Sequence, residues 1–179
     1  QSRPRFRETY IQQAYLKMIE HAREEILIAN AYFVATPSVS LALEDAARRC
    51  VSINIISNSP ETNDLPEISM VGRGHYKTLL EINATPEVEA CDNPAAGIRI
   101  WEWVGQAVHE PARSQGTMHS KFAVVDSRRS LVGSYNLDPR SERLNSESAI
   151  VFEQEELAGR LRRLFLESDL KYSREVTSR

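Results

Sequence analysis

Residues 119–147, HSKFAVVDSRRSLVGSYNLDPRSERLNSE, place two short apolar runs among sparse polar residues. The runs FAVVD and SLVG, joined by SRR, predict two adjacent strands with a tight polar turn. Side chains alternate along a strand, so His119 and Lys121, two positions apart, point to the same face and can enter one pocket. The whole polar set is His119, Lys121, Asp126, Ser134, Asn136, Asn145 and Glu147.

The sequence on either side alternates between helical and strand patterns. Apolar spacing predicts helices over residues 7–23, 38–49, 69–83 and 153–170. Runs of β-branched and apolar residues predict strands over residues 26–33, 51–59, 98–103 and 148–153. A strand, a helix and a second strand within about thirty residues are typical of a parallel pair. The chain is therefore predicted to be a single α/β domain over residues 1–179, with its core over about 24–166.

Three segments are predicted to be irregular. Residues 57–65, SNSPETNDL, form a polar loop at the carboxyl end of a predicted strand, where α/β sheets tend to place ligand sites. A plain solvated connector is an equal alternative for this loop. Residues 104–117 are rich in Gly, Pro, Ser and Gln and predict a mobile loop, and residues 171–179 predict a frayed tail.

The composition excludes several classes of protein. The 41% hydrophobic and 26% charged residues are typical of a globular domain. No apolar run approaches the roughly 18 to 20 residues that span a bilayer. The net charge of −3 argues against a dedicated nucleic-acid binder, although it leaves room for a locally basic site. Cys50 and Cys91 have no CxxC spacing, and they indicate neither a disulfide scaffold nor a zinc site.

Four of the polar residues suit the chemistry of a phosphate ester. A neutral imidazole such as His119 can attack phosphorus, which divides one hard displacement into two easier steps. Lys121 supplies a positive charge for the phosphate oxygens, and Ser134 and Asn136 add hydrogen-bond donors. Lys121, Ser134 and Asn136 are therefore the predicted phosphate-binding residues, with His119 as the nucleophile.

Two carboxylates complete the predicted catalytic set. Glu147 or Asp126 can accept the second imidazole N–H, which fixes the tautomer so that the attacking nitrogen carries the lone pair. Orientation is the more natural role for Glu147, and Asp126 can brace the turn. None of these steps requires a metal ion. A metal site is a lesser alternative, and its candidate ligands are His75, His109, Cys91 and Asp92.

This spacing is similar to the signature of the phospholipase D superfamily, H-x-K-x4-D-x6-G-S-x-N. The matching residues are His119, Lys121, Asp126, Gly133, Ser134 and Asn136. Between Glu24 and Phe165, the segments AYFVATP, SINIISNS and GSYNLDPRSERLNSE resemble the carboxyl-terminal half of bacterial cardiolipin synthases. The resemblance implies a phospholipase D-like αβα sandwich, in which a mixed sheet lies between helices.

The resemblance also implies a reaction. Two such motifs meet at an interface, where one histidine becomes a phosphohistidine and the other protonates the leaving alcohol. An alcohol acceptor gives phosphatidyl transfer on phospholipid head groups, and water gives hydrolysis. The implied partners are a phospholipid substrate and a peripheral membrane contact, with nucleic acid a weaker candidate and no cofactor. The implied location is the cytoplasm or the inner membrane surface of a bacterium.

The chain contains a single motif of this kind. His75-Tyr76-Lys77 is a near miss, because neither the aspartate nor the Gly-Ser-x-Asn follows, and a helix is the better interpretation. The second motif would come from a missing half or from a homodimer mate. Two other hypotheses stay open: a phospholipase D-like endonuclease that acts as a homodimer, and a non-catalytic docking half of a two-motif protein.

Overall fold

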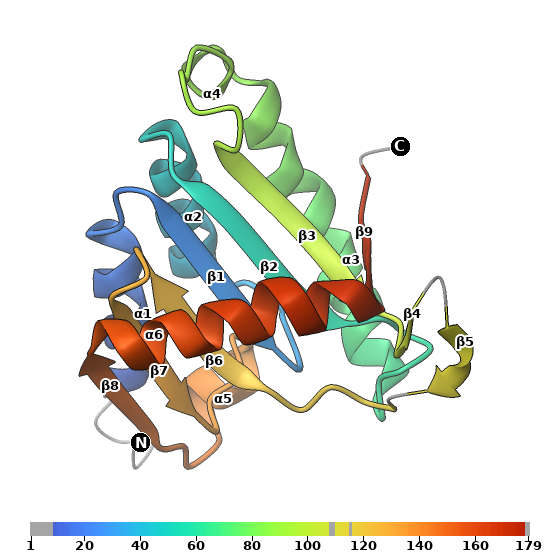
Figure 1. Cartoon of the computed structure of the whole chain (residues 1–179). Coiled ribbons are helices and arrows are strands. Elements are labelled where there is room, and N and C mark those ends of the chain that lie inside the picture. The colour runs from blue at the N-terminus through green and yellow to red at the C-terminus, as the bar shows by residue number, and fades with distance from the viewer. Residues whose placement is uncertain (1–8, 108–109, 115, 178–179) are drawn as a thin grey trace.

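A seven-stranded mixed sheet forms the centre of the protein, seen here in a computed structural model that describes residues 9–107, 110–114 and 116–177 (Figure 1). Across the sheet the strands are β8 (Ala149–Glu153), β7 (Arg129–Gly133), β6 (Lys121–Val125), β1 (Glu25–Asn30), β2 (Ser52–Asn58), β3 (Gly97–Trp103) and β9 (Ser173–Glu175). The pairs β1–β2 and β2–β3 are parallel, and every other pair is antiparallel. The predicted parallel pair and the mixed sheet are confirmed.

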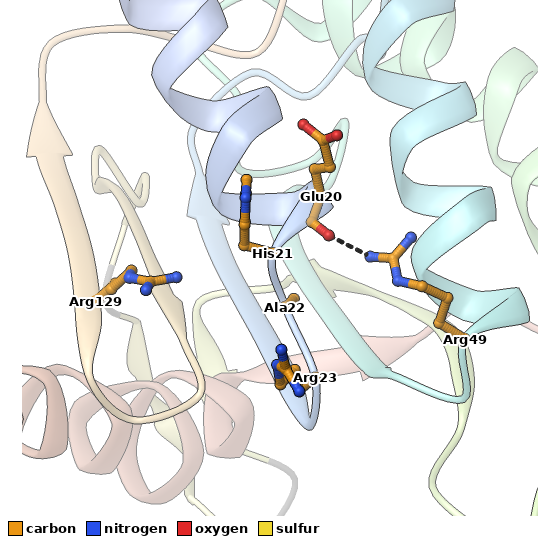
Figure 2. Close-up of a pocket in the computed structure, with 6 residues that line it drawn as sticks. All are labelled: Glu20, His21, Ala22, Arg23, Arg49 and Arg129. Atoms are coloured by element: carbon orange, nitrogen blue, oxygen red, sulfur yellow. Dashed lines mark hydrogen bonds between the residues drawn. The ribbon is translucent and has the colours of Figure 1, made fainter.

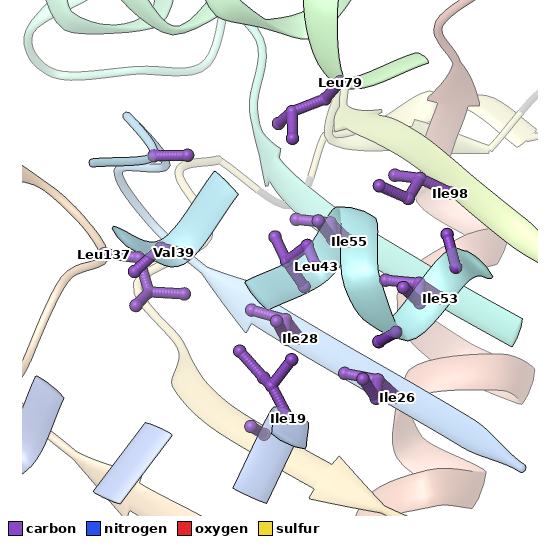
Figure 3. Close-up of a cluster of buried hydrophobic side chains, with 14 of the residues drawn as sticks. Ile19, Ile26, Ile28, Val39, Leu43, Ile53, Ile55, Leu79, Ile98 and Leu137 are labelled. Atoms are coloured by element: carbon purple, nitrogen blue, oxygen red, sulfur yellow. The ribbon is translucent and has the colours of Figure 1, made fainter. Parts of the chain in front are cut away.

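Helices cover both faces of this sheet (Figure 1). One face carries α1 (Tyr10–Glu20), α2 (Pro37–Arg48) and α3 (Pro66–Glu81), and the other carries α6 (Glu155–Arg163). Alternation along β1 explains both layers: Ile26 and Ile28 pack in one cluster, and Leu27 packs in the other. Figure 3 shows the first cluster, with Leu43 of α2 among the strand isoleucines. The predicted αβα sandwich is confirmed.

The helix starts follow local chemistry. Thr36 has extended backbone angles and Pro37 occupies the first helical position of α2, as the sequence predicts. The third helix, α3, starts three residues earlier than predicted, at Pro66. A Cβ at Gly72 would lie 2.6 Å from the carbonyl oxygen of Phe33, so glycine lets α3 pack closely against the chain after β1. Short elements follow: 82–84 (3-10), α4 (Pro86–Glu89), α5 (Pro139–Arg143), a π turn at 164–168 and a 3-10 turn at 169–172.

Two segments predicted to be irregular contain strands. Residues 104–117 include a hairpin of β4 (Gln106–Ala107) and β5 (Glu110–Ser114), while 108–109 and 115 lie outside the described residues. The predicted frayed tail is wrong for residues 173–175, because β9 pairs with β3. Arg174 of β9 donates to the buried carboxylate of Glu102 at 3.2 Å. A three-residue strand is too short to show a period in the sequence.

The spacing of the two cysteines indicates no disulfide scaffold, and the structure nevertheless contains a disulfide. Cys50 follows α2 and Cys91 follows α4, and a disulfide joins them with a Cα–Cα distance of 5.5 Å. The two residues are 41 positions apart in the sequence. Only the packing of α4 beside α2 brings them together.

Within the described residues, no helix combines the length and the hydropathy that crossing a bilayer requires.

Candidate active site

The predicted nucleophile and its cationic neighbour lie where β6 begins. Lys121 is the first residue of β6 and pairs with Asn30, the last residue of β1. The side chain of His119 is exposed, whereas Lys121 is only 8% exposed. The Lys121 ammonium donates to the His119 carbonyl oxygen at 3.2 Å. The pair therefore lies at the carboxyl ends of the parallel strands, the edge where ligand sites are expected.

Asn58, the last residue of β2, fixes the chain immediately before His119. Its side-chain amide donates to the Met118 carbonyl at 2.8 Å and accepts the Met118 N–H at 3.0 Å. The same amide nitrogen donates to the carbonyl of Ala31 at 3.0 Å. Because Asn58 is fully buried and binds both backbone groups of Met118, it holds the backbone that carries the imidazole.

Asn30 does the same for the second half of the motif. Its side chain donates to the Tyr135 carbonyl at 3.3 Å and accepts the Leu137 N–H at 3.0 Å. These two contacts bracket Asn136. The end of β1 therefore positions the predicted phosphate donor through Asn30, as the end of β2 positions His119 through Asn58.

Ser134 and Glu147 are joined across the β7–β8 pair. A Cβ at Gly133 would lie 2.2 Å from the carbonyl oxygen of Ser148, so this glycine of the motif is required for the close approach of β8. Backbone bonds then hold Ser134 opposite Ser148: Ser134 N–H donates to the Ser148 carbonyl at 2.9 Å, and Ser134 Oγ accepts the Ser148 N–H at 3.0 Å. The Ser134 hydroxyl donates to the carboxylate of Glu147.

The second oxygen of Glu147 accepts from Asn145 and Ser141. The Ser141 hydroxyl lies 3.0 Å away and the Asn145 amide 3.2 Å away. Ser141 Oγ also accepts the backbone N–H of Asn136 at 3.3 Å. Asn136 Oδ1 is buried and has no hydrogen-bond partner within the described part of the chain. This oxygen can accept from a donor group of a ligand, whereas a phosphoryl oxygen would have to bind the amide NH2 group of Asn136. That Glu147 orients the imidazole of His119 stays a prediction.

The structure does not bring Asp126 into this group, which corrects its place in the predicted catalytic set. Asp126 follows β6 at the end opposite Lys121. At about 3.3 Å per strand residue, the two residues are roughly 17 Å apart. Its carboxylate accepts the backbone N–H groups of residues 23–25 at 2.8 to 3.2 Å. Asp126 and Ser127 both have φ of 52°, and these bonds offset the cost of that turn. Bracing the turn is the role the geometry supports.

Tyr32 and Asp64 also line the site, and sequence reasoning did not single them out. The Tyr32 ring meets the His119 ring edge-on with centroids 6.4 Å apart, and Lys121 Nζ lies 5.9 Å from the Tyr32 centroid. The Tyr32 hydroxyl donates to Asp64, within the loop over residues 57–65. Burial, together with that bond and the charges of Asp64 and Asp138, raises the pKa of Tyr32 to about 12. The loop therefore contacts the site.

The charge balance around Lys121 is unusual for an anion site. Burial lowers the pKa of the Lys121 ammonium, and the nearby carboxylates of Glu147, Asp64 and Asp138 partly oppose that effect. Asp138 is buried, and desolvation raises its pKa even though it accepts the Ser141 N–H at 2.7 Å as the cap of α5. One cation thus faces three carboxyl groups.

The alternative of a metal site loses one of its candidates. Cys91 is bound to Cys50 and cannot act as a thiolate ligand. His109 lies outside the described residues. His75 is on α3, as the helical interpretation of His75-Tyr76-Lys77 predicts. Within residues 9–107, 110–114 and 116–177, no group of three or more His, Cys, Asp or Glu side chains could hold a metal ion.

A signal for the buried asparagines is present in the sequence. The strands EILIAN and SINIISN are apolar over most of their length, and each one ends in asparagine. A polar residue at the end of a buried strand must find partners, since an unpaired buried amide costs free energy. Tyr32, Asp64 and Ser141 carry no comparable signal, because their contacts depend on how three loops meet.

Comparison with known proteins finds similarity to cardiolipin synthases. A family model described as "Cardiolipin synthase, PLD-like domain" matches residues 15–169. Cardiolipin synthase A of Proteus mirabilis is 31% identical over 154 residues, which is 86% of this chain and 26% of the Proteus protein. The chain therefore spans about a quarter of the length of the curated relatives it matches.

Solved structures share the fold at low sequence identity. The phospholipase D family member Nuc from Salmonella typhimurium has a TM-score of 0.63 at 20% identity, covering 93% of this chain and 91% of Nuc. Phosphatidylserine synthase from Haemophilus influenzae has a TM-score of 0.68 at 15% identity, covering 93% of this chain and 37% of the synthase. At such identities the likeness concerns the arrangement of strands and helices.

Proposed function

The chain belongs to the family of phospholipase D-like domains of cardiolipin synthases, and from that membership we propose that it carries half of a phosphatidyltransferase or phosphodiesterase site. The observation that carries the proposal is the grouping of His119, Lys121, Ser134 and Asn136 at one end of the sheet. The exposed imidazole can reach a substrate, and its backbone is held by Asn58. The substrate is a phosphodiester in a phospholipid head group.

His119 would act as the nucleophile. One ring nitrogen forms a bond to phosphorus while the bond between phosphorus and the head-group oxygen breaks, and the alcohol leaves with a proton from a second histidine. A hydroxyl of a second lipid, or water, then attacks phosphorus and releases His119. Lys121 and the Asn136 amide bind the phosphoryl oxygens, where negative charge builds up in each transition state.

The charge balance supports a site completed by a second motif. Lys121 faces the carboxyl groups of Glu147, Asp64 and Asp138, and Arg140 offsets part of the charge of Asp138. An anionic phosphodiester gains little in such a half site, because like charges repel over these distances. A second motif would add another lysine and the histidine that protonates the leaving group. It would come from another copy of the chain or from a separate half.

Exposed apolar residues flank the site and favour a lipid over a nucleic acid. Leu65 follows Asp64 and is 42% exposed, and Met70 on the first turns of α3 is 65% exposed. On the other side, Leu144 precedes Asn145 and is 77% exposed. Apolar side chains around a head-group site suit the acyl region of a lipid. A nucleic-acid groove would need a row of cations, and Lys121 is surrounded by carboxylates.

The test is to trap the covalent intermediate. Protein incubated with phosphatidylglycerol vesicles is quenched in denaturant, and its intact mass is measured for a phosphatidyl adduct. We expect an adduct that His119→Ala abolishes, because His119 is the proposed nucleophile. His75→Ala removes an exposed histidine of α3 and is the matched control, which should keep the adduct.

An adduct that persists in His119→Ala would contradict the proposal. Light scattering after size exclusion separates the other hypotheses. A two-fold dimer that forms the adduct supports self-assembly, and a stable monomer without adduct supports the docking half. An endonuclease would cut DNA in a salt-dependent manner and leave vesicles unchanged.

The disulfide bears on the location. Disulfides persist in oxidising compartments and are rare in the cytoplasm, so the Cys50–Cys91 bond favours a membrane face outside the cytoplasm. Of the two locations that the resemblance implies, the disulfide argues against the cytoplasm and is compatible with a surface of the inner membrane. Thiol labelling of protein taken directly from cells would decide between the two: labelling of both cysteines before reduction supports the cytoplasm.

A further inference from the structure

A cavity of about 480 Å³ opens at the end of the parallel strands opposite His119 (Figure 2). We call it the arginine pocket, and its lining residues are Glu20, His21, Ala22, Arg23, Arg49 and Arg129. It lies beside the start of β1, whereas Lys121 pairs with the end of that strand. Five residues of strand separate the two sites, which corresponds to about 17 Å.

Three parts of the chain bring these groups together. His21 follows α1, Arg23 precedes β1, Arg49 follows α2 and Arg129 begins β7. In Figure 2 the guanidinium of Arg129 points toward His21 and Arg23, whereas the carboxylate of Glu20 points away from them. These cations come from separate elements and converge on one cavity. The cluster is therefore distinct from a row of solvated charges along one helix.

The guanidinium of Arg49 is fixed in place. Its Nη2 atom donates to the carbonyl oxygens of Ile19 at 3.0 Å and Glu20 at 3.1 Å, which satisfies the carboxyl end of α1. A guanidinium has five N–H donors, so the others remain for a ligand. His21 Nδ1 lies 2.7 Å from the Lys17 carbonyl and must carry a proton to donate there, which leaves Nε2 for the cavity.

The positive charges of Arg23 and Arg129 are the least balanced by neighbouring carboxylates. The Arg23 side chain makes no hydrogen bond or ion pair with any residue that the structure describes. Arg129 Nε lies 3.6 Å from Glu153 Oε1, which is too far for a hydrogen bond. That same oxygen binds Arg128 at 2.8 Å. One exposed carboxylate thus serves two arginines.

The pocket therefore holds an excess of positive charge within a chain of net charge −3. Three arginines and one glutamate line it. A smaller adjoining cavity adds Arg128, together with Glu24 and Asp126. The Asp126 oxygens already accept four backbone N–H contacts, so this carboxylate offers little to the arginines.

We propose that the arginine pocket is a second anion site, which binds a phosphate monoester group through the guanidinium groups of Arg23, Arg49 and Arg129, with the His21 ring beside them. The planar fork of a guanidinium matches two oxygens of a phosphate, and several forks around one cavity suit a compact dianion. Ala22 is the only apolar residue of the lining, so the pocket offers no large apolar side chain for an acyl chain to pack against. The ligand is a free phosphate compound or a lipid head group that ends in phosphate.

Residue-resolved NMR tests the proposal on the full chain. Inorganic phosphate and glycerol phosphate are titrated at constant ionic strength, with chloride as the reference anion. We expect saturable shifts of the His21 ring and Arg23 Nε–H signals, and a loss of affinity of about tenfold or more in Arg23→Gln. Arg23→Lys keeps the charge and should lose less. Flotation with vesicles containing phosphatidic acid shows whether a lipid is the source.

The matched control is Arg160→Gln, which removes one arginine of α6 that pairs with Glu156. It should change the affinity less than about twofold, since it lies outside the pocket. Equal weakening by both variants would mean general charge attraction and would overturn the proposal. Shifts that chloride reproduces, or that never saturate, would also overturn it. Because His119 and Lys121 report separately in the same spectra, failure at the candidate active site is distinguishable from failure here.

Discussion

The two ends of the parallel strands use different groups for the same task. At the carboxyl ends, the neutral amides of Asn30 and Asn58 hold the backbone of the candidate active site. At the amino ends, the carboxylate of Asp126 holds the backbone N–H groups of residues 23–25. Both ends need fixed loops, yet only one of them uses a charge.

The local charge explains this difference. Lys121 already faces the carboxyl groups of Glu147, Asp64 and Asp138, and a further carboxylate there would oppose the binding of an anionic substrate. At the other end, Asp126 lines a cavity together with Arg23, Arg128 and Arg129, so cations outnumber the other carboxylates around it. A neutral amide thus suits the end that has to accept a phosphate.

The ends also differ in covalent support. The disulfide lies on the amino side, where Cys50 is two residues before the start of β2, and the carboxyl side of the described chain is held by noncovalent contacts. This contrast is open to test by variants at each end.

The largest effect is expected from the disulfide. Replacing both Cys50 and Cys91 by alanine frees a loop with a sequence separation of 41, and the chain-entropy model gives a loss of about 4 kcal/mol in the free energy of unfolding. Urea denaturation with and without reductant measures it. The reduced wild type should match the variant, and equal stability of the oxidised protein and the variant would show that the bond contributes nothing.

A smaller effect is expected from the two side chains that hold backbone groups. Asn58→Ala leaves both backbone groups of Met118 without partners in a buried site and should cost about 2 to 4 kcal/mol. Asp126→Ala should cost about 1 to 3 kcal/mol, because water can replace part of its contacts.

The two variants should act at opposite ends of the parallel strands. Asn58→Ala should shift the NMR signals of His119, whereas Asp126→Ala should shift those of Arg23 and leave the candidate active site unchanged. Asp126→Asn keeps the turn geometry and serves as the conservative control. Signals of His119 that move equally in both variants would show that the two ends are not independent.

The smallest effect concerns the pH dependence of Lys121. Burial lowers the pKa of its ammonium, so the positive charge is lost at a lower pH than in a free lysine. Phosphate binding at the active-site end should therefore weaken as the pH rises through that lowered pKa. Asp64→Asn removes one carboxylate that supports the charge, and it should lower the pKa further.

The measurement is an NMR titration of the Lys121 side chain. The sign for stability follows from the same shift: between the lowered pKa and the ordinary lysine value, the unfolded chain binds a proton that the folded chain does not, so stability rises with pH. A Lys121 pKa at or above that of a free lysine would contradict the burial argument.

Much of the fold could be predicted from local patterns. The isoleucines of β1 and β2, the Thr36-Pro37 start of α2 and the β6–β7 pair all follow from periods and signals within a few residues. The prediction failed for β9 and for the segment over residues 104–117, where strands of two to five residues are too short to show a period.

The candidate site divides in the same way. The sequence motif identifies His119, Lys121 and Gly133 directly, because their spacing can be read along the chain. Asp126 belongs to the same motif and lies at the opposite end of its strand, because a pattern of fixed spacing gives no direction in space. Spacing identified the residues, and the length of β6 separated them.

The sequence by itself determined the family, the alternation of strands and helices, and the reactive residues of one motif. Those properties depend on neighbours a few positions apart, where backbone geometry sets which side chains share a face. The tertiary structure alone decided the contacts between distant segments. Asn58 holds Met118 across 60 positions and Asn30 holds Leu137 across 107, while the disulfide and the arginine pocket join parts of the chain that no local pattern relates.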